Sequence, residues 1–368
     1  MKIISTKDNL VHGVQTCQRT ISTKNPLPVL SGILLKADNG KLTFTATDLE
    51  VGIECTVPVS VEDNGEVVLP AKILGEIVRK LPDVKIYLDV NKQNNTAVIR
   101  YGQSKFDLRG FSSEDFPILP EIDSSFMLSI KQELFKNMIK QVIFATSNDD
   151  NRPIFTGVLM EINDDNVRLV STDTHRLAFR AGKTQKGVEW EKSIIIPGKT
   201  LNELSRILTG EGEEVIISFG DNQVFFEIPG VRLISRLIEG QFPNYKQVIP
   251  EGCKTKIKVN SRKLLEAAER ASLLAREGSN FIKMAVNQDN MTISSNSPDI
   301  GKIEEQLVIE MEGEETEIAF NSKYLIDVLK VIDSEEIFLE LTGSLSPGII
   351  KPAKGENYVY LILPIRIV

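Results

Sequence analysis

Apolar residues in six stretches of the chain recur with the spacing of an amphipathic helix. In the second stretch they are Ile73, Leu74, Ile77, Val78 and Leu81, which fall on one side of a helix because three or four positions make about one helical turn. The same pattern predicts helices over 6–19, 72–81, 131–145, 199–208, 261–276 and 322–332. Each helix should therefore bury one stripe and expose the opposite side.

Short segments of alternating apolar and polar residues lie between these helices. Examples are 41–46, 214–219, 223–228 and 231–238, with turn-forming residues such as Asp38-Asn39-Gly40 and Gly220-Asp221-Asn222 between strands. Alternation of this kind is typical of strands with one buried face, and the turns connect antiparallel neighbours. The predicted fold class is therefore α+β, with antiparallel sheet and two helices in each unit.

Part of the sequence occurs three times, at intervals of about 125 residues. LPAKILGEIVRKL at 69–81 returns as IPGKTLNELSRIL at 196–208 and as FNSKYLIDVLKVI at 320–332. A second block, which runs from Asn25 to TDLEVGIE, is echoed from Asn151 to TDTHRLAFR. Units of this size have their own cores, so we expect three similar domains at 1–122, 126–249 and 253–368, with linkers at 117–125 and 248–254.

Composition places the protein in an ordinary class. The 368 residues are 41% hydrophobic and 26% charged, as in soluble globular proteins. No apolar run approaches the roughly 20 residues of a membrane span, and the N-terminus lacks the apolar core of a signal sequence. Cys17, Cys55 and Cys253 lack metal or redox spacing, and an odd count suits a reducing compartment. We expect a cytoplasmic protein with neither metal nor other cofactor.

The charge is distributed unevenly along the chain. The net charge is −8, but the six predicted helices together carry +9, so the remainder carries −17. Helices that all faced one way would give a basic face suited to sequence-independent contact with a phosphate backbone. The alternative is that Lys and Arg simply favour helices while Asp and Glu also occupy loops.

Catalytic motifs are missing from the sequence. It has two histidines, His12 and His175, and contains neither a Walker A sequence nor the G-x-S-x-G, H-E-x-x-H or G-x-G-x-x-G motifs. Asp173 could orient His175 as a base, but the pair recurs in no other repeat and no nucleophile accompanies it. We therefore do not expect an enzyme.

Several segments together resemble one known family. The three repeats, the opening MKIIS, the block STDTHRLAFR, the phrase EGQFPNYKQVIP and the ending YLILPIRIV are similar to those of the bacterial DNA polymerase III beta subunit, the replicative sliding clamp. The resemblance covers essentially the whole chain. It implies a head-to-tail homodimeric ring with helices inside around duplex DNA, sheets outside, and a non-catalytic role as a processivity factor that tethers polymerase to template.

Geometry supports two chains per ring. Twelve helices packed side by side at about 10 Å give a hole roughly 38 Å across, whereas six give only about 19 Å. Six are too few for duplex DNA, whose two groove depths alone sum to about 16 Å. The alternative function is a monomeric, non-encircling scaffold that binds peptides without ring closure.

The resemblance also implies the partners and a site for them. The partners are duplex DNA of any sequence, a second copy of the chain, the replicative polymerase catalytic subunit, the clamp loader and other proteins with a clamp-binding motif; no membrane is expected. Proteins of this family capture a short peptide, usually a Gln followed by apolar and aromatic anchors, between the second and third domains. The matching residues are Phe155, Thr172, Thr174, His175, Arg176, Leu177, Pro243, Val248, Ser346, Leu361, Leu363 and Pro364.

The chemistry of these residues suits a peptide. Aliphatic side chains and prolines would form an apolar floor, and His175 and Arg176 would hold polar atoms at its edge. The chain departs from the family at Thr174, where glycine or serine is common, and in two extra residues beyond Arg366. The added bulk of Thr174 bears on the shape of the site.

Two further sets of residues follow from the resemblance. The DNA contacts would be Lys24, Lys72, Arg79, Asn148, Lys199 and Arg206, and Asp149 is left out because a carboxylate repels phosphate. The dimer seam would contain Phe106 and Leu108 of the first domain and Leu273 and Leu274 of the third. The alternative for these four is that they are ordinary core residues.

Overall fold

The computed structural model describes residues 1–21, 27–121, 126–210, 212–275, 280–355 and 357–366. The predicted DNA contact Lys24 lies outside these residues. The chain forms two compact units: unit 1 is Met1–Gln132 with Arg206–Leu237, and unit 2 is Glu133–Ser205 with Ile238–Val368.

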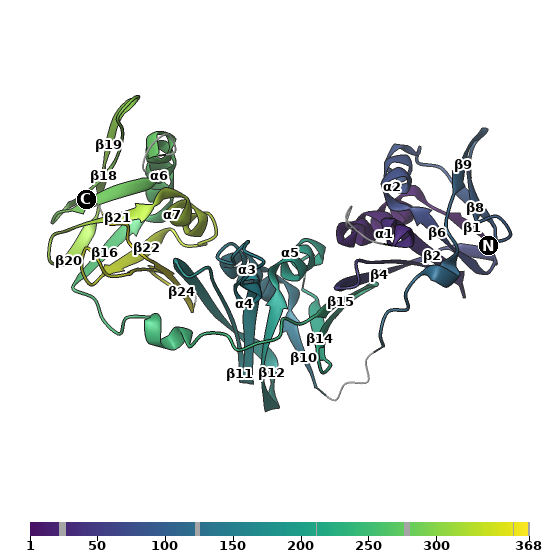
Figure 1. Cartoon of the computed structure of the whole chain (residues 1–368), viewed down its shortest axis with the longest axis horizontal. Helices are drawn as coiled ribbons and strands as arrows, with labels where there is room; N and C mark the ends of the chain where they lie inside the picture. Colours follow the sequence, from purple (N-terminus) through teal and green to yellow (C-terminus); the bar gives the residue numbers. More distant parts are fainter. Residues whose placement is uncertain (22–26, 122–125, 211, 276–279, 356, 367–368) are drawn as a thin grey trace. The chain divides into compact units, whose positions relative to one another are not determined.

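Unit 1 contains two antiparallel sheets (Figure 1). The five-stranded sheet has the order β5 (Ser60–Asp63), β1 (Lys2–Ser5), β7 (Ile86–Asn91), β8 (Thr96–Tyr101), β9 (Ser104–Arg109). The eight-stranded sheet has the order β10 (Met127–Lys131), β13 (Glu214–Phe219), β14 (Gln223–Ile228), β15 (Val231–Arg236), β4 (Val51–Pro58), β3 (Lys41–Thr47), β2 (Gly32–Asp38), β6 (Gly65–Pro70).

Two helices of unit 1, α1 (Lys7–Cys17) and α2 (Ala71–Lys80), pack against each other, and Figure 1 shows them on one side of the strands. Thr6 caps α1 by accepting a hydrogen bond from the backbone N of Asn9 (3.3 Å). Gly13 lets α1 approach β3 closely, because a Cβ there would lie 2.2 Å from the ring of Phe44. Leu10 and Val14 of the same helix are also buried.

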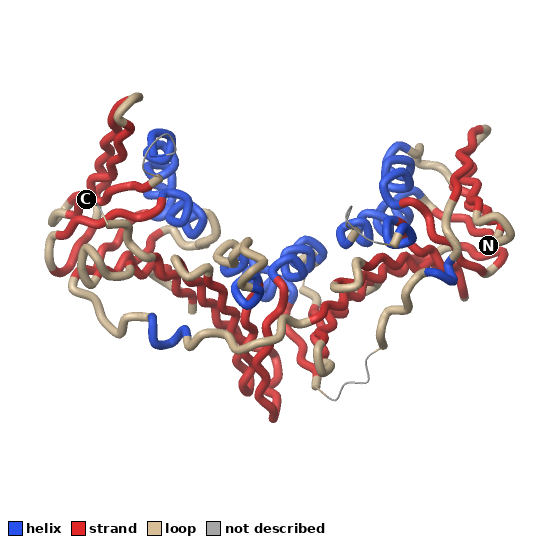
Figure 2. The backbone as a smooth tube through the Cα atoms, in the orientation of Figure 1, coloured by secondary structure: helices blue, strands red, loops and turns tan. Residues whose placement is uncertain are grey.

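Unit 2 is also built on two antiparallel sheets. The seven-stranded sheet has the order β11 (Gly157–Thr172), β12 (Arg176–Pro197), β24 (Tyr358–Ile362), β23 (Gly348–Pro352), β22 (Glu336–Leu341), β16 (Thr255–Asn260), β20 (Glu310–Gly313). The four-stranded sheet has the order β19 (Gly301–Val308), β18 (Asn290–Ser297), β17 (Phe281–Val286), β21 (Thr316–Asn321). The helices α6 (Ser261–Ala275) and α7 (Ser322–Leu329) pack against each other and against these strands (Figure 2).

The remaining helices belong to the second repeat. They are α3 (Gln132–Ile143), the single turn α4 (Pro153–Thr156) and α5 (Gly198–Ile207). Four short 3₁₀ segments complete the described structure: η1 (Gln18–Thr20), η2 (Pro28–Ser31), η3 (Ser113–Asp115) and η4 (Tyr245–Val248).

The structure confirms all six predicted helices to within three residues at each end, and three of the four example strands to within one residue. The fourth, predicted over 231–238, ends earlier, at Arg236. The sequence did not predict α4 or the 3₁₀ segments, because four residues are too few to show a helical period. The predicted middle domain, 126–249, contributes to both compact units, since β15 pairs with β4 while β12 pairs with β24. The bounds of the three domains stay a prediction.

The cysteines differ sharply in exposure. All three are free thiols; Cys17 and Cys55 are buried in unit 1, and Cys253 is exposed. Burial raises the pKa of Cys17 well above its usual value and that of Cys55 to about 11. We expect a thiol reagent at pH 8 to modify one cysteine quickly, at Cys253, and the other two only when the protein unfolds, because the thiolate is the reactive form. Mass spectrometry after brief labelling tests this; fast modification of Cys17 or Cys55 in native protein would contradict it.

Candidate peptide site, seam and nucleic-acid interface

The turn between β11 and β12 carries five of the predicted peptide-site residues, and side chains hold its shape. Asp173 Oδ1 accepts hydrogen bonds from the backbone N of His175 and of Arg176, each at 3.0 Å. Thr172 Oγ1 donates to the carbonyl of Arg176 (2.7 Å) and accepts from the backbone N of Thr174 (3.1 Å). Four local hydrogen bonds therefore fix the backbone from Thr172 to Arg176.

Strand pairing then decides which of these side chains share a face. Leu177 on β12 lies opposite Leu361 on β24, and the backbone N of Leu363 donates to the carbonyl of His175 (2.9 Å). Because side chains alternate along a strand and opposite residues share a face, Leu177, Leu361 and Leu363 point to the same side. The structure thus brings together residues nearly two hundred positions apart.

An apolar cluster occupies that side of the sheet. Its buried members are Leu159, Val170, Leu177, Ile195, Tyr245, Ile349 and Leu361, with Ile154, Phe179, Ile238, Phe242, Ile249 and Val359 packed against them. The segment that covers the cluster is the EGQFPNYKQVIP phrase, anchored by Tyr245, whose hydroxyl donates to Glu161 Oε2 (2.6 Å). Burial and Glu161 raise the pKa of Tyr245, so its hydroxyl keeps its proton.

Exposed apolar side chains surround this cluster. Val248 is 52% exposed next to Ile249, and Leu363 is 38% exposed two residues after Leu361. Pro243 is exposed, while Phe155, Ser346 and Pro364 are half-buried. Leu177 and Leu361 are buried, so they form a floor below these exposed residues. We call Val248, Leu363 and the 172–177 turn the candidate peptide site.

Sequence reasoning missed Leu345. It is 64% exposed in the turn between β22 and β23, whose backbone N of Ser346 donates to the carbonyl of Gly343 (3.2 Å). Gly348 at the start of β23 lies opposite Ile362, the residue before Leu363. This turn therefore lies beside the end of β24. The sequence pointed to this turn only through Ser346, the neighbour of Leu345, which was among the predicted peptide-site residues.

Arg176 has a different environment from its neighbours in the turn. It alternates with His175 and Leu177 and so faces the other side of the sheet. Its side chain is only 6% exposed and donates to Asp173, to Asp327 and to the carbonyl of Phe144. Burial alone would lower the pKa of Arg176, but Tyr360, Asp327 and Asp173 outweigh it and raise that pKa. The structure thus gives Arg176 three partners within the protein, and its predicted role at the edge of the peptide site stays a prediction.

The backbone explains the family's preference at position 174. Thr174 has φ = +78°, in the left-handed region that glycine adopts most easily and β-branched residues rarely do. Its side chain is exposed. The same turn weakens the case for His175 as a base, because both carboxylate oxygens of Asp173 bind the turn and Arg176.

Unit 1 repeats this turn at TDLEV. Asp48 Oδ1 accepts from the backbone N of Glu50 (3.1 Å) and Val51 (2.8 Å), and Leu49 has φ = +77°. The residue after Val51 is Gly52, where a Cβ would lie 2.7 Å from Leu119 Cδ2. Leu119 therefore occupies the space that a side chain at position 52 would need, whereas the matching position in the second repeat carries Leu177.

The four predicted seam residues differ in exposure. Phe106 is exposed and Leu108 half-buried on β9, an edge strand on which both point to the same face. Phe106 stacks on Tyr101, with ring centroids 5.9 Å apart. On α6, Leu273 is 63% exposed and Leu274 half-buried. The core alternative is thus wrong for Phe106 and Leu273.

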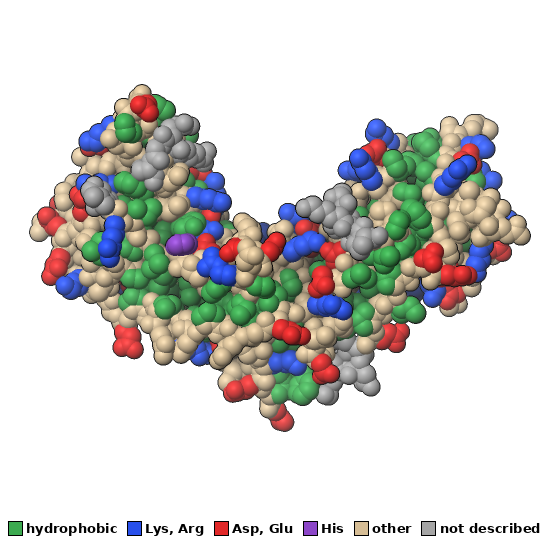
Figure 3. Space-filling model, viewed as in Figure 1, with side chains coloured by type: hydrophobic (Ala, Val, Ile, Leu, Met, Phe, Trp, Pro, Cys, Tyr) green, Lys and Arg blue, Asp and Glu red, His purple; other side chains and the backbone are tan. Residues whose placement is uncertain are grey.

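The predicted DNA contacts on helices are exposed. Lys72 and Arg79 on α2 are seven residues apart, as are Lys199 and Arg206 on α5, so each pair shares one side of its helix. Lys199 and Asn148 line one open hollow of about 570 Å³ in unit 2. Figure 3 shows Lys and Arg side chains interspersed with Asp and Glu on the visible face.

Asp149 is an ionised carboxylate with partners close by in the chain. Its carboxylate accepts hydrogen bonds from Asn151 Nδ2 (2.9 Å) and Arg152 Nε (3.0 Å). These bonds to Asn151 and Arg152 lower the pKa of Asp149 and keep it ionised. The adjacent guanidinium offsets the repulsion that excluded Asp149 from the predicted contacts.

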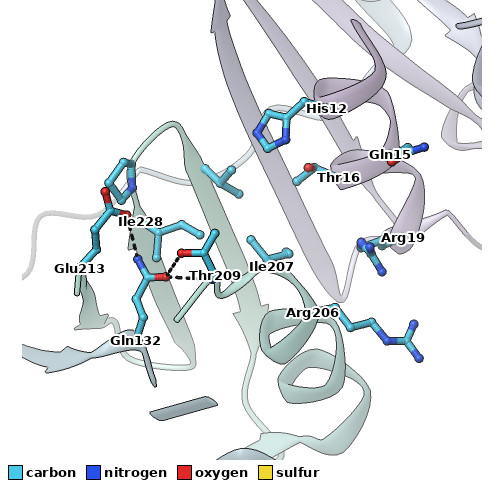
Figure 4. Close-up of a pocket in the computed structure, with 12 residues that line it drawn as sticks. His12, Gln15, Thr16, Arg19, Gln132, Arg206, Ile207, Thr209, Glu213 and Ile228 are labelled. Atoms are coloured by element: carbon cyan, nitrogen blue, oxygen red, sulfur yellow. Dashed lines mark hydrogen bonds between the residues drawn. The ribbon is translucent and has the colours of Figure 1, made fainter. Parts of the chain in front are cut away.

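A second cavity lies within unit 1, with a volume of about 210 Å³. Figure 4 shows His12, Gln15, Thr16 and Arg19 on one side of it, with Arg206, Ile207 and Thr209 across from them. Gln132 connects two other residues that line the cavity: its Nε2 donates to Glu213, and its Oε1 accepts from Thr209. The cavity is smaller than the roughly 300 Å³ at which ligand pockets begin.

Among the described residues, no group of three or more His, Cys, Asp or Glu side chains is placed to hold a metal ion. None of the helices in the described segments has the length and apolar character needed to cross a membrane.

Comparisons with known proteins cover the whole chain. The sequence matches three families, described as the DNA polymerase III beta subunit N-terminal domain (residues 1–120), central domain (129–244) and C-terminal domain (246–366). The beta sliding clamp of Bacillus subtilis is 39% identical over all of both chains, and that of Staphylococcus aureus strain N315 is 36% identical over 100% of this chain and 99% of its own.

Solved structures agree with the sequence matches. The Bacillus subtilis DNA polymerase sliding clamp superposes with a TM-score of 0.96 at 38% identity, covering 100% of each chain. A sliding clamp from Pseudomonas aeruginosa, solved bound to griselimycin, gives 0.94 at 31% identity with the same coverage.

These matches and the fold define the class of the protein, a three-domain DNA clamp of antiparallel sheets and a few helices. The chain belongs to the DNA polymerase III beta subunit family, the beta sliding clamps. Its function is that of a sliding clamp in processive DNA replication, a non-catalytic subunit that works with DNA and with clamp-binding proteins. The resemblance seen in the sequence is confirmed.

Proposed function

We propose that two copies of this chain close head to tail into a ring around duplex DNA, and that the candidate peptide site tethers the replicative polymerase catalytic subunit, the clamp loader and other proteins with a clamp-binding motif. The observation that carries the proposal is the exposure of Val248 and Leu363 over an apolar floor, in a family of sliding clamps. We propose the cytoplasm as its location, because all three cysteines are free thiols.

Two sheet edges support ring closure. β9 ends the five-stranded sheet of unit 1, and β19 ends the four-stranded sheet of unit 2. An edge strand presents backbone groups that can pair with another chain, and β9 adds the exposed ring of Phe106. Next to β19, α6 adds Leu273, and Arg270 on the same helix binds Glu305 of β19. Two identical seams of this kind join β9 of one protomer to β19 and α6 of its partner.

The site's chemistry supports an apolar peptide anchor. Burying the exposed parts of Val248 and Leu363 under a leucine or phenylalanine removes apolar surface from water at about 25 cal/mol per Å². The backbone beneath them is fixed by the Asp173 turn and by the β12–β24 pairing. A preformed surface loses little conformational entropy on binding, which favours capture of a short, extended motif.

The exposed cations support loose contact with DNA. Lys72, Arg79, Lys199 and Arg206 are on helices and Asn148 is in a loop. Such contacts bind phosphates and carry no sequence information. Lys24 remains a proposed contact by family resemblance.

Retention on DNA of different topology tests encirclement. We expect clamp loaded on closed circular DNA to elute with it at high salt and to leave within minutes once the circle is linearised, because a ring is held by topology and not by phosphate contacts, which salt weakens. Gel filtration of radiolabelled clamp before and after restriction cutting provides the measurement. Equal loss from circular and linear DNA would favour the non-encircling scaffold.

A further inference from the structure

Arg176 joins three separate segments of unit 2. Its Nε binds Asp173 Oδ2 (2.9 Å) in the turn, one terminal nitrogen binds Asp327 Oδ2 (2.7 Å) on α7, and the other binds the carbonyl of Phe144 (2.5 Å) after α3. Its guanidinium carbon also lies 4.3 Å from the ring centroid of Tyr324 on α7. All three nitrogens of the guanidinium thus have partners from different elements.

This network is largely excluded from water. The side chains of Arg176, Asp173 and Asp327 are 6%, 12% and 24% exposed. An ion pair this far from solvent is screened little, and removal of one partner leaves the other charge buried without compensation. Arg176 therefore depends on Asp327 to stay where it is, with its planar fork divided between two carboxylates.

Asp173 connects this network to the candidate peptide site. One of its oxygens receives Arg176, and the other accepts the two backbone N–H groups that shape the turn. This turn also binds the end of the C-terminal strand, because the carbonyl of His175 accepts a hydrogen bond from the backbone N of Leu363. A shift of Arg176 would therefore move the turn and Leu363 together.

We propose that Asp327 is a positioning residue for the peptide site: it contacts no peptide, and through Arg176 it holds the turn from Thr172 to Arg176 in the binding-competent arrangement. The inference rests on the proposed function of the site. It also makes the junction between α7 and the β11–β12 turn a determinant of affinity. Substitutions on α7 would then lower the affinity for partner peptides, although no residue of α7 contacts the peptide.

The test is the binding kinetics of a Gln-x-x-Leu-Phe pentapeptide to full-length protein. We expect Asp327→Asn, which keeps the size and removes the charge, to raise Kd about tenfold, because the bond from Arg176 to a carboxylate becomes a weaker bond to a neutral amide and the competent fraction of the site falls. The loss should appear as a slower association rate with an unchanged dissociation rate. A substitution of a contacting residue, Leu363→Ala, should instead speed dissociation.

Matched variants separate positioning from a general loss of stability. Glu269→Gln makes the same chemical change in the exposed ion pair between Glu269 and Lys330, the residue after α7 (3.0 Å), and should leave both rates unchanged. Asp327→Glu should recover part of the association rate. Should Asp327→Asn fail to fold, Arg176→Lys provides a second measurement, since it keeps the charge but loses the fork, and the same slow association is expected.

The outcomes are distinct. Wild-type rates for Asp327→Asn, or a rise in Kd carried by faster dissociation, would overturn the inference while the peptide site stands. Failure of the wild-type protein to bind the pentapeptide at all would overturn the proposed site and the inference with it.

Discussion

Replacing Leu273 with aspartate is expected to convert the dimer into a monomer of 41.0 kDa. Leu273 is 63% exposed in the single chain and would be covered at the seam, where a carboxylate without a partner is costly to bury. The ring has two identical seams, so each substitution acts twice. Interface anchors of this type contribute about 2 kcal/mol or more each, and we therefore expect the dimer Kd to rise by at least about a thousandfold.

Sedimentation velocity across a dilution series measures the effect. The matched control is Ile118→Asp, which introduces the same charge at a side chain that is 95% exposed and lies outside the proposed seam; it should remain dimeric. The Leu273 variant should also fail to stay on closed circular DNA. A Leu273→Asp protein that sediments as the wild-type dimer at every concentration would exclude α6 from the seam.

Leu363→Asp is expected to abolish peptide binding while leaving the fold intact. Its side chain is partly exposed at the end of β24, so a carboxylate there can remain in water in the free protein but must be desolvated under an apolar anchor. We expect pentapeptide affinity to fall about a hundredfold, the range of a hot-spot residue, with Tm unchanged. Polymerase processivity on a primed template should fall in parallel.

Fluorescence anisotropy and thermal denaturation of the same samples test this. Ile216→Asp, at a similarly exposed apolar residue on β13, should bind peptide as the wild type does. Leu177→Asp should behave differently from both, because it buries a charge in the floor of the site and should unfold unit 2. Undiminished peptide binding by Leu363→Asp would move the site elsewhere.

Much of the fold could be read from the sequence because its signals are local. The apolar spacing of 72–81 or 261–276 depends on neighbours within a few turns, and the structure places α2 and α6 there. The three-fold repeat needed only comparison of the chain with itself. The short turn α4 gave no periodic signal, and the division of 126–249 between two compact units depends on strands pairing across the predicted domain boundaries.

The candidate site was predicted less completely than the fold. Its residues lie on different faces of the sheet, and strand pairing decides which face each one occupies. The sequence predicted the same role for Arg176 as for its neighbour His175. Strand alternation and the pairing with β24 instead direct the Arg176 side chain toward Asp327 and Tyr324. Conversely, Leu345 has no motif of its own and is found only through the β22–β23 turn beside Leu363.

The sequence by itself determined the helices, the α+β class, the three repeats and the family, since each depends on residue order alone. Tertiary structure decided which apolar side chains are floor and which are exposed: Leu177 and Leu361 are buried, and Val248 and Leu363 are not. It also decided that the two similar turns, TDLEV and TDTHR, have different surroundings. Beside the first turn, Leu119 fills the space next to Gly52, whereas the second turn is part of the candidate peptide site. Pairing between distant strands sets these outcomes, and no local pattern contains it.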